Sequence, residues 1–252
     1  MVHKWSITIP ELTDENRNVY VYVPESCGQF PDRRYPVLYM FDGHNVFFDS
    51  DATYGKCWGM KEYMDRTNTQ MIVAAVECSH TADNGRLKEY TPFAFSDPGL
   101  GKIESKGKIT MDWFVHTLKP EIDRRYPTLP DRAHTFISGS SMGGLMTLYA
   151  ILSYPQYFSR GAALSPSLWV APRKLEQMIR SSSLLPDTFL YMDYGELEFE
   201  NHPNIQSQFS RITSLLINKG VLLESRIVPK GTHCEASWEK QIPFFMSVLT
   251  CQ

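Results

Sequence analysis

A serine framed by glycines stands in the segment "SGSSMGGL", residues 138–145. Gly139, Ser141 and Gly143 fit the pattern G-x-S-x-G, in which small neighbours permit a sharp strand-to-helix turn that exposes the central serine as a nucleophile. Ser140 lacks this frame, because glycine stands two residues before and two after Ser141 only. A glycine-rich turn of this kind can also bind phosphate at a helix N-terminus. The segment lacks the lysine of a P-loop and the spacing of a dinucleotide-binding turn, so we favour the nucleophile.

A serine nucleophile needs a histidine base that a carboxylate orients. In folds that carry this serine turn, the chain order is serine, acid, histidine, and only His202 and His233 follow Ser141. His233 comes directly after the last predicted strand, whereas His202 precedes Pro203 at the start of a predicted helix. We therefore predict His233 as the base and His202 as a surface residue or a residue of the helix's N-terminal turn.

The acid is expected between the serine and the histidine, in the segment "YMDYGELEFE" at 191–200. Glu198 follows Gly195 by three residues, where a turn can carry a carboxylate toward His233. Asp193 lies nearer the strand, where its side chain is expected to cap backbone. Glu198 is the predicted acid and Asp193 is the alternative. The segment offers four carboxylates: Asp193, Glu196, Glu198 and Glu200.

An acyl-transfer site also needs backbone N–H groups that stabilise the oxyanion. The residue after the nucleophile, Met142, supplies one such group, and the loop after the third strand, "FDGHNVFFDS" at 41–50, supplies another. We predict the second donor to be the amide of His44, which follows a tight Asp42–Gly43 turn.

The elements that position these residues alternate along the chain, which predicts an α/β fold with a mostly parallel sheet of about eight strands and helices on both faces. Helical periods occur at 114–122, at 205–216 before Gly220, and at 238–249, where Pro243 should kink or delay the helix. Ligands of such sheets bind beyond the carboxyl ends of the strands, which is where the predicted site residues stand. The predicted strands are 5–10, 18–24, 35–41, 70–77, 134–139, 160–165, 188–195 and 222–229.

One long irregular segment, 78–109, follows the fourth predicted strand. Loops of this length inside compact domains are usually functional. We expect it to rim the site and to help select the substrate, the alternative being a solvated surface excursion.

Composition limits the classes of function. The chain has 252 residues, 42% of them apolar, and a net charge of −3 with no basic stripe, which predicts one globular domain over 1–252 and no nucleic-acid partner. The first residues lack a signal peptide's apolar core and no apolar run could span a bilayer, so we expect a cytoplasmic protein without membrane contact. The five cysteines show neither disulfide nor metal-ligand spacing, so no metal is expected.

Taken together, several segments resemble the putative esterase family of α/β-hydrolases, which includes enterochelin-esterase-like enzymes, feruloyl esterases, S-formylglutathione hydrolases and the antigen 85 mycolyltransferases. The resemblance implies an α/β-hydrolase fold, a triad of Ser141, Glu198 and His233, an oxyanion hole from His44 and Met142, and no cofactor. Many relatives have glutamine where this chain has His44. The matching segments are "LYMFDGHNVFF", "EYTPF", "LKPEIDRRYP", "HTFISGSSMGGLMTLYAILSYPQYFSRGAALSPSLW", "YMDYGELE" and "GTHCEASW".

The resemblance also implies that Trp58, Tyr90 and Trp169 flank the site and bind substrate, although aromatic residues of this kind also fill cores. Only about six residues separate "LSPSLW" from the next predicted helix, so no large lid is expected.

We therefore expect a serine esterase that acts through an acyl-enzyme on small soluble esters: feruloyl, acetyl-sugar, siderophore or short-chain acyl. Two alternatives remain, namely acyl transfer to another alcohol by the same triad and a hydrolase-fold binding protein that has lost turnover. The sequence leaves self-association open.

Overall fold

The computed structural model describes residues 1–201 and 203–251. Eight strands form one sheet. β2 pairs antiparallel with both β1 and β4, whereas β3, β4, β7, β8, β9 and β10 run parallel to one another. All eight strands match predicted ones, so the predicted fold class is confirmed. Their order across the sheet is β1 (Val2–Ile9), β2 (Thr13–Tyr22), β4 (Ile72–Val76), β3 (Val37–Met40), β7 (Thr135–Ser140), β8 (Arg160–Leu164), β9 (Phe189–Gly195) and β10 (Leu222–Val228).

Burial of both faces explains the apolar runs of the central strands. Every residue of β3, β4 and β7 is buried, as expected for parallel strands covered by helices on both sides. The edge strands β1 and β10 instead consist of exposed and partly buried positions, apart from the buried Ile9.

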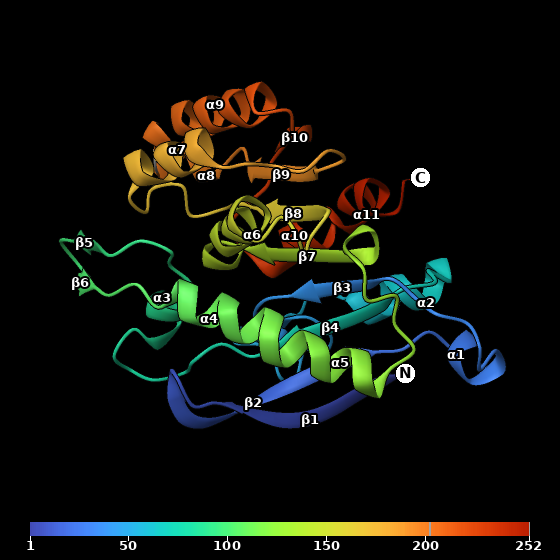
Figure 1. Cartoon of the computed structure of the whole chain (residues 1–252). Helices are drawn as coiled ribbons and strands as arrows, with labels where there is room; N and C mark the ends of the chain where they lie inside the picture. The colour runs from blue at the N-terminus through green and yellow to red at the C-terminus, as the bar shows by residue number, and fades with distance from the viewer. Residues whose placement is uncertain (202, 252) are drawn as a thin grey trace.

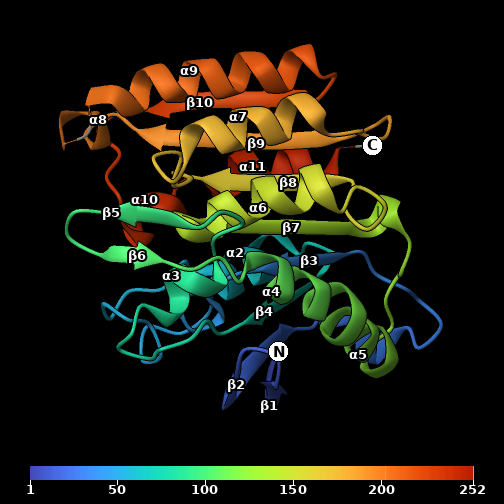
Figure 2. The same ribbon diagram turned by 60° about the vertical axis from the view of Figure 1, so that its left-hand side comes forward.

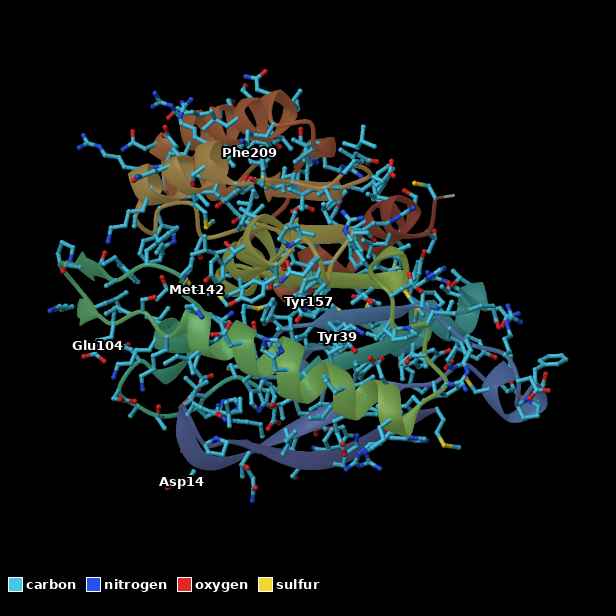
Figure 3. The ribbon with its side chains drawn as sticks, viewed as in Figure 1. Asp14, Tyr39, Glu104, Met142, Tyr157 and Phe209 are labelled. Carbon is cyan, nitrogen blue, oxygen red and sulfur yellow. The ribbon has the colours of Figure 1, made fainter. Side chains whose placement is uncertain are left out.

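Helices cover both faces of the sheet (Figure 1, Figure 2). The first face carries α4 (Gly107–Trp113), the π-helical turn η2 (Phe114–Leu118), α5 (Lys119–Arg125), α6 (Met142–Ser153), α7 (Pro172–Ser181) and α9 (Pro203–Asn218). The opposite face carries α2 (Met60–Thr67), α10 (Glu235–Glu239) and α11 (Ile242–Thr250). Each face buries its own apolar cluster; Tyr39 and Phe209, labelled in Figure 3, belong to the first.

Helix boundaries follow local sequence signals. Pro243 occupies the first turn of α11. The helical segment is interrupted just before it, between the end of α10 and the start of α11, so the predicted interruption is confirmed. The short elements are α1 (Ser26–Gln29), η1 (Gly43–Asn45), α3 (Gly85–Glu89), β5 (Phe95–Asp97), β6 (Gly101–Ile103), η3 (Arg132–His134) and α8 (Glu198–Asn201). None of the helices within the described ranges is long and apolar enough to cross a membrane.

The segment 78–109 differs from the predicted irregular loop, because it contains α3 and the β5–β6 hairpin. The hairpin strands are only three residues long, too short for a periodic pattern to reveal them. The Phe95 ring packs edge-on against Trp169 with centroids 5.5 Å apart, and Lys174 donates to the carbonyl of Ala94. These contacts fix the hairpin beside the loop after β8.

The strand order reverses between β3 and β7, which predicts a ligand site at this edge of the sheet. From β3 the chain moves to β4 on one side and then crosses to β7 on the other side. Such a reversal separates the loops at the carboxyl ends and creates the usual ligand site of an open α/β sheet. The loop that begins at Phe41 packs against the turn at Ser141, since a Cβ on Gly143 would lie 3.0 Å from Cβ of Phe41.

Candidate active site

Ser141 occupies the turn between β7 and α6 in a conformation that few side chains adopt, with φ 57° and ψ −119°. The flanking glycines make this turn possible. A Cβ on Gly139 would lie 2.7 Å from the carbonyl carbon of Gly143, and a Cβ on Gly143 would lie 3.0 Å from Cβ of Phe41. Ser140 is buried at the end of β7. The glycine frame therefore presents Ser141 rather than Ser140. Met142, which follows Ser141 in the chain, is labelled in Figure 3.

Ser141 opens into a cavity of about 530 Å³ that Glu198 and His233 also line. The structure thus brings together the three residues predicted as a triad. Oγ of Ser141 lies 3.5 Å from Oγ of Ser167, and among the described residues no hydrogen bond joins it to His233. Catalytic hydrogen bonds are often long without substrate, so this arrangement is compatible with a resting site.

His233 and Glu198 form a direct pair, with Nδ1 of His233 2.7 Å from Oε2 of Glu198. The His233 side chain is 47% exposed and that of Glu198 only 7%. A buried carboxylate on Nδ1 fixes the tautomer in which Nε2 is free to accept a proton.

Two further donors hold the other oxygen of Glu198. Oε1 accepts hydrogen bonds from Ser165 Oγ at 2.7 Å and from the amide of Gly195 at 2.8 Å. Burial alone would raise the pKa of Glu198, but the hydrogen bonds from His233 and Ser165, the charge of His233 and the Gly195 amide together lower it below its usual value. Glu198 is therefore ionised at neutral pH.

Ser165 links the acid to the opposite face of the sheet. Its hydroxyl donates to Glu198 and accepts a hydrogen bond from Nε1 of Trp238 at 3.0 Å. The Trp238 ring in turn lies edge-on to His233 with centroids 5.1 Å apart. Sequence reasoning missed Ser165 and Ser167, although Ser165 is the last residue of the sixth predicted strand, 160–165, and Ser167 follows it at the edge where the site residues gather.

Asp193, the alternative acid, lies elsewhere. Its carboxylate accepts hydrogen bonds from the Tyr191 hydroxyl at 2.8 Å and from the Ser165 amide at 3.2 Å. It is 1% exposed and does not line the cavity. This placement matches the expectation that Asp193 caps backbone. His202, the alternative base, falls outside the described residues.

The turn after β3 carries the predicted oxyanion donor. Asp42 adopts φ 56°, and its carboxylate binds Arg86 through two hydrogen bonds of 2.7 Å each. Burial opposes ionisation of Asp42, but Arg86 holds its pKa below the usual value. The amides of His44 and Met142 donate to no backbone carbonyl of the described residues. Met142 lines the cavity, whereas His44 is buried and is not among the described residues that line it.

The three predicted substrate-binding aromatics lie in different places. Trp169 is 37% exposed and lines the cavity together with Arg86 and Leu87 of the 78–109 segment. Trp58 is 3% exposed and packs on Trp238 in the core. Tyr90 is buried, and its hydroxyl accepts a hydrogen bond from the amide of Asp42. The structure therefore places Trp58 and Tyr90 outside the cavity lining, since both fill space beneath the loops.

The family model named "Putative esterase" matches residues 11–244. The chain belongs to the Putative esterase family. It is 28% identical over 242 residues to the ferri-bacillibactin esterase BesA of Bacillus subtilis (strain 168), a match that spans 91% of this chain and 81% of BesA. It is also 25% identical over 138 residues to the siderophore triacetylfusarinine C esterase of Aspergillus fumigatus. That match spans 53% of this chain and 44% of the fungal protein. Family membership supports a carboxylic-ester hydrolase.

Solved structures of esterases share the fold of this member of the Putative esterase family. A ferulic acid esterase superposes with a TM-score of 0.73 at 19% identity, covering 99% of this chain and 97% of that one. The enterobactin and salmochelin hydrolase IroE superposes with a TM-score of 0.70 at 20% identity, covering 99% and 95%. These similarities establish the α/β-hydrolase fold.

Proposed function

We propose that the protein is a serine carboxylic-ester hydrolase that works through an acyl-enzyme. Ser141 is the nucleophile, His233 the general base and acid, and Glu198 the group that orients His233. The observation that carries the proposal is the convergence, in one cavity, of a serine in a strained strand-to-helix turn and a histidine bound to a buried carboxylate.

In the first half-reaction, His233 takes the proton of Ser141 Oγ as this oxygen bonds to the ester carbonyl carbon. The amides of His44 and Met142 stabilise the oxygen that becomes negative. The intermediate then collapses: the carbon–oxygen bond to the alcohol breaks, and the alcohol leaves with the proton from His233. An acyl group remains on Ser141.

In the second half-reaction, His233 removes a proton from water, and the water oxygen attacks the acyl carbon. The bond to Ser141 Oγ breaks, Ser141 recovers its proton from His233, and the carboxylic acid leaves. Throughout the cycle the buried carboxylate of Glu198 stabilises the imidazolium that forms twice. Neither of the two proposed half-reactions requires a cofactor.

The substrates we propose are small soluble esters, since a cavity of about 530 Å³ matches ordinary small-molecule sites. Apolar side chains, including Leu87, Trp169 and Ile205, line it beside Arg86. Siderophore and feruloyl esters are the first classes to test, because relatives and structural neighbours carry those names. Acetyl-sugar and short-chain acyl esters complete the set. The cytoplasmic location and the single domain over 1–252 stay predictions.

The experiment is a hydrolysis screen of the full chain on these four ester classes, with release of both acid and alcohol measured. We expect turnover of at least one class by the wild type and by Ser140→Ala, and none by Ser141→Ala. Absence of turnover on every class would contradict the enzyme proposal and favour a binding protein. Acyl products formed with an added alcohol instead of water would favour acyl transfer.

A further inference from the structure

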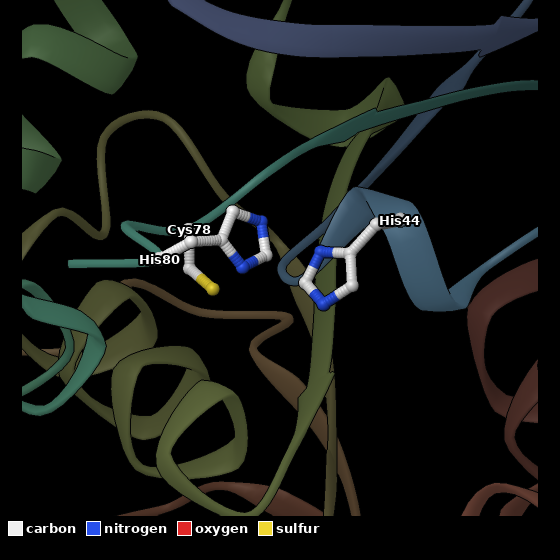
Figure 4. Close-up of side chains that lie close together, drawn as sticks. All are labelled: His44, Cys78 and His80. Atoms are coloured by element: carbon white, nitrogen blue, oxygen red, sulfur yellow. The ribbon is translucent and has the colours of Figure 1, made fainter. Parts of the chain in front are cut away.

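Three potential metal ligands outside the proposed triad converge beside the turn after β3. His44 comes from η1, while Cys78 and His80 come from the segment after β4. Since β3 and β4 are neighbouring parallel strands, their carboxyl ends bring these two loops together. One ligand atom from each residue lies within 4.8 Å of the others, and Figure 4 shows the two rings turned toward each other beside the Cys78 side chain.

The His44 side chain has an unmet hydrogen-bonding group. It is only 6% exposed, and Nε2 lies 3.0 Å from Oγ1 of Thr53. Its other nitrogen, Nδ1, is buried and has no hydrogen-bond partner among the described residues. A buried polar atom without a partner costs free energy, and Nδ1 is the nitrogen left to take a ligand.

We propose that His44, Cys78 and His80 bind a zinc ion, with a fourth position open to solvent. Imidazole and thiolate ligands suit Zn²⁺, whereas Mg²⁺ and Ca²⁺ require oxygen ligands. Zinc sites with three protein ligands and an open fourth position are tetrahedral and draw on histidine and cysteine. The Cys78 thiol gives its proton to solvent as its sulfur binds the metal.

The geometry requires a modest closure. Zinc bonds of about 2.0–2.3 Å set ligand atoms about 3.5 Å apart, so the widest spacing must shorten by roughly 1 Å. His80 can supply this movement because it is exposed and no hydrogen bond holds its ring among the described residues. Its ring centroid is already 4.8 Å from that of His44.

Charges around the cluster favour a cation. Asp42 and Glu77 are the carboxylates that act on His44, and Arg86 is the opposing cation. Arg86 and Asp42 compensate each other's charge through two hydrogen bonds, which leaves Glu77 as the net negative charge that acts on His44. The site stands independently of the proposed triad, although His44 would serve both: its side chain binds the metal and its amide is the proposed oxyanion donor.

The test uses the full chain freed of metal by a chelator and then titrated with Co²⁺ as a spectroscopic substitute for Zn²⁺. We expect one equivalent to bind with a thiolate-to-cobalt charge-transfer band in the near ultraviolet, and one equivalent of Zn²⁺ to remove it. Cys78→Ser should abolish the band. His80→Ala, at an exposed position, should weaken zinc affinity by at least about tenfold without changing the unfolding transition.

Matched controls are Cys57→Ser, at another buried cysteine, and His116→Ala, at another exposed histidine; both should bind like the wild type. Absence of the charge-transfer band in the wild type would overturn the proposal. So would wild-type zinc affinity in His80→Ala, or an equal loss in the control variants.

Discussion

Glu198 and Asp193 stand five residues apart in the chain, yet their surroundings shift their ionisation in opposite directions. Burial raises the pKa of Asp193 to about 7, against the hydrogen bonds from Tyr191 and Ser165. The pKa of Glu198 is lowered in spite of burial, because His233, Ser165 and Gly195 all donate to it. The residue that binds His233 is therefore the one that stays charged at neutral pH.

We predict that Glu198→Gln folds but has a kcat lower by about 10³- to 10⁴-fold, because an amide neither fixes the His233 tautomer nor stabilises its imidazolium. Steady-state kinetics on p-nitrophenyl acetate measure this loss. Asp193→Asn is the matched control and should retain most activity. A near-normal kcat in Glu198→Gln beside a folded, inactive Asp193→Asn would transfer the role to Asp193.

The raised pKa of Asp193 also predicts a pH dependence of stability. The unfolded carboxyl group loses its proton near pH 4, whereas the folded group keeps it until about pH 7. Between these values the folded state binds more protons, so a rise in pH lowers the free energy of unfolding by up to about 1.4 kcal/mol per pH unit. Asn at position 193 cannot ionise and is free of this loss.

The free energy of unfolding of Asp193→Asn, relative to wild type, should therefore increase between about pH 5 and about pH 8. Urea unfolding at the two pH values measures the difference. A relative stability that is the same at both would contradict a raised pKa at this position.

Among the elements, the loops after β9 and β10 determine how Glu198 meets His233. They cross at two glycines: a Cβ on Gly231 would lie 2.8 Å from Cα of Gly195 and 3.0 Å from the carbonyl oxygen of Val228. Leu197 also donates its amide to the carbonyl of Gly231 at 3.0 Å. The close backbone contact holds the acid and the base on adjacent loops.

We predict that Gly231→Ala pushes these loops apart and lowers both stability, by about 1–3 kcal/mol, and kcat, because the pair of Glu198 and His233 is displaced. Urea unfolding and esterase kinetics measure the two effects. Gly28→Ala is the control, since a Cβ there meets nothing within 4 Å. Wild-type kcat in Gly231→Ala would show that the crossing does not position the pair.

Element identity was the most predictable level, because buried strands appear as apolar runs and the break before α11 follows from Pro243. The positions of Ser141, Glu198 and His233 in one cavity follow from chain order and from the rule that ligands bind beyond the carboxyl ends of strands. Side-chain direction was not predictable in the same way. Trp58 and Tyr90 lie in site-forming segments but point into the core, since tertiary packing alone decides which side a loop residue faces.

Contacts between loops that are distant in the chain could not be predicted from the sequence either. Trp238 donates a hydrogen bond to Ser165, although the two residues are 73 positions apart in the chain. No rule of sequence spacing relates them. His44 joins Cys78 and His80 only because β3 and β4 are neighbours in the sheet. The absence of metal-ligand spacing in the sequence therefore says little about ligand sets that the fold assembles.

For the whole molecule, the sheet order is what concentrates the chemistry. The reversal between β3 and β7 brings the turn at Asp42 against the turn at Ser141, and β8, β9 and β10 add Ser165, Glu198 and His233 along the same edge. The segments after β4, β7, β8, β9 and β10 thus line one cavity, and the family model extends over nearly the whole chain.

We predict that a chelator does not lower esterase activity, because every proton and bond of the proposed cycle is handled by Ser141 and His233 with Glu198. Rates before and after EDTA treatment of the full chain measure this. Activity lost in EDTA and restored by zinc or calcium would contradict the mechanism. Removal of zinc from the proposed site at His44 takes away none of the three groups.

The central claim is that Ser141 is the nucleophile, and covalent labelling with a fluorophosphonate tests it most directly. The label should be found by peptide mass spectrometry on Ser141, in the wild type and in Ser140→Ala, with loss of activity in proportion to labelling. Ser141→Ala should take up no label and hydrolyse no ester. A label on another residue, or undiminished hydrolysis by Ser141→Ala, would contradict the account.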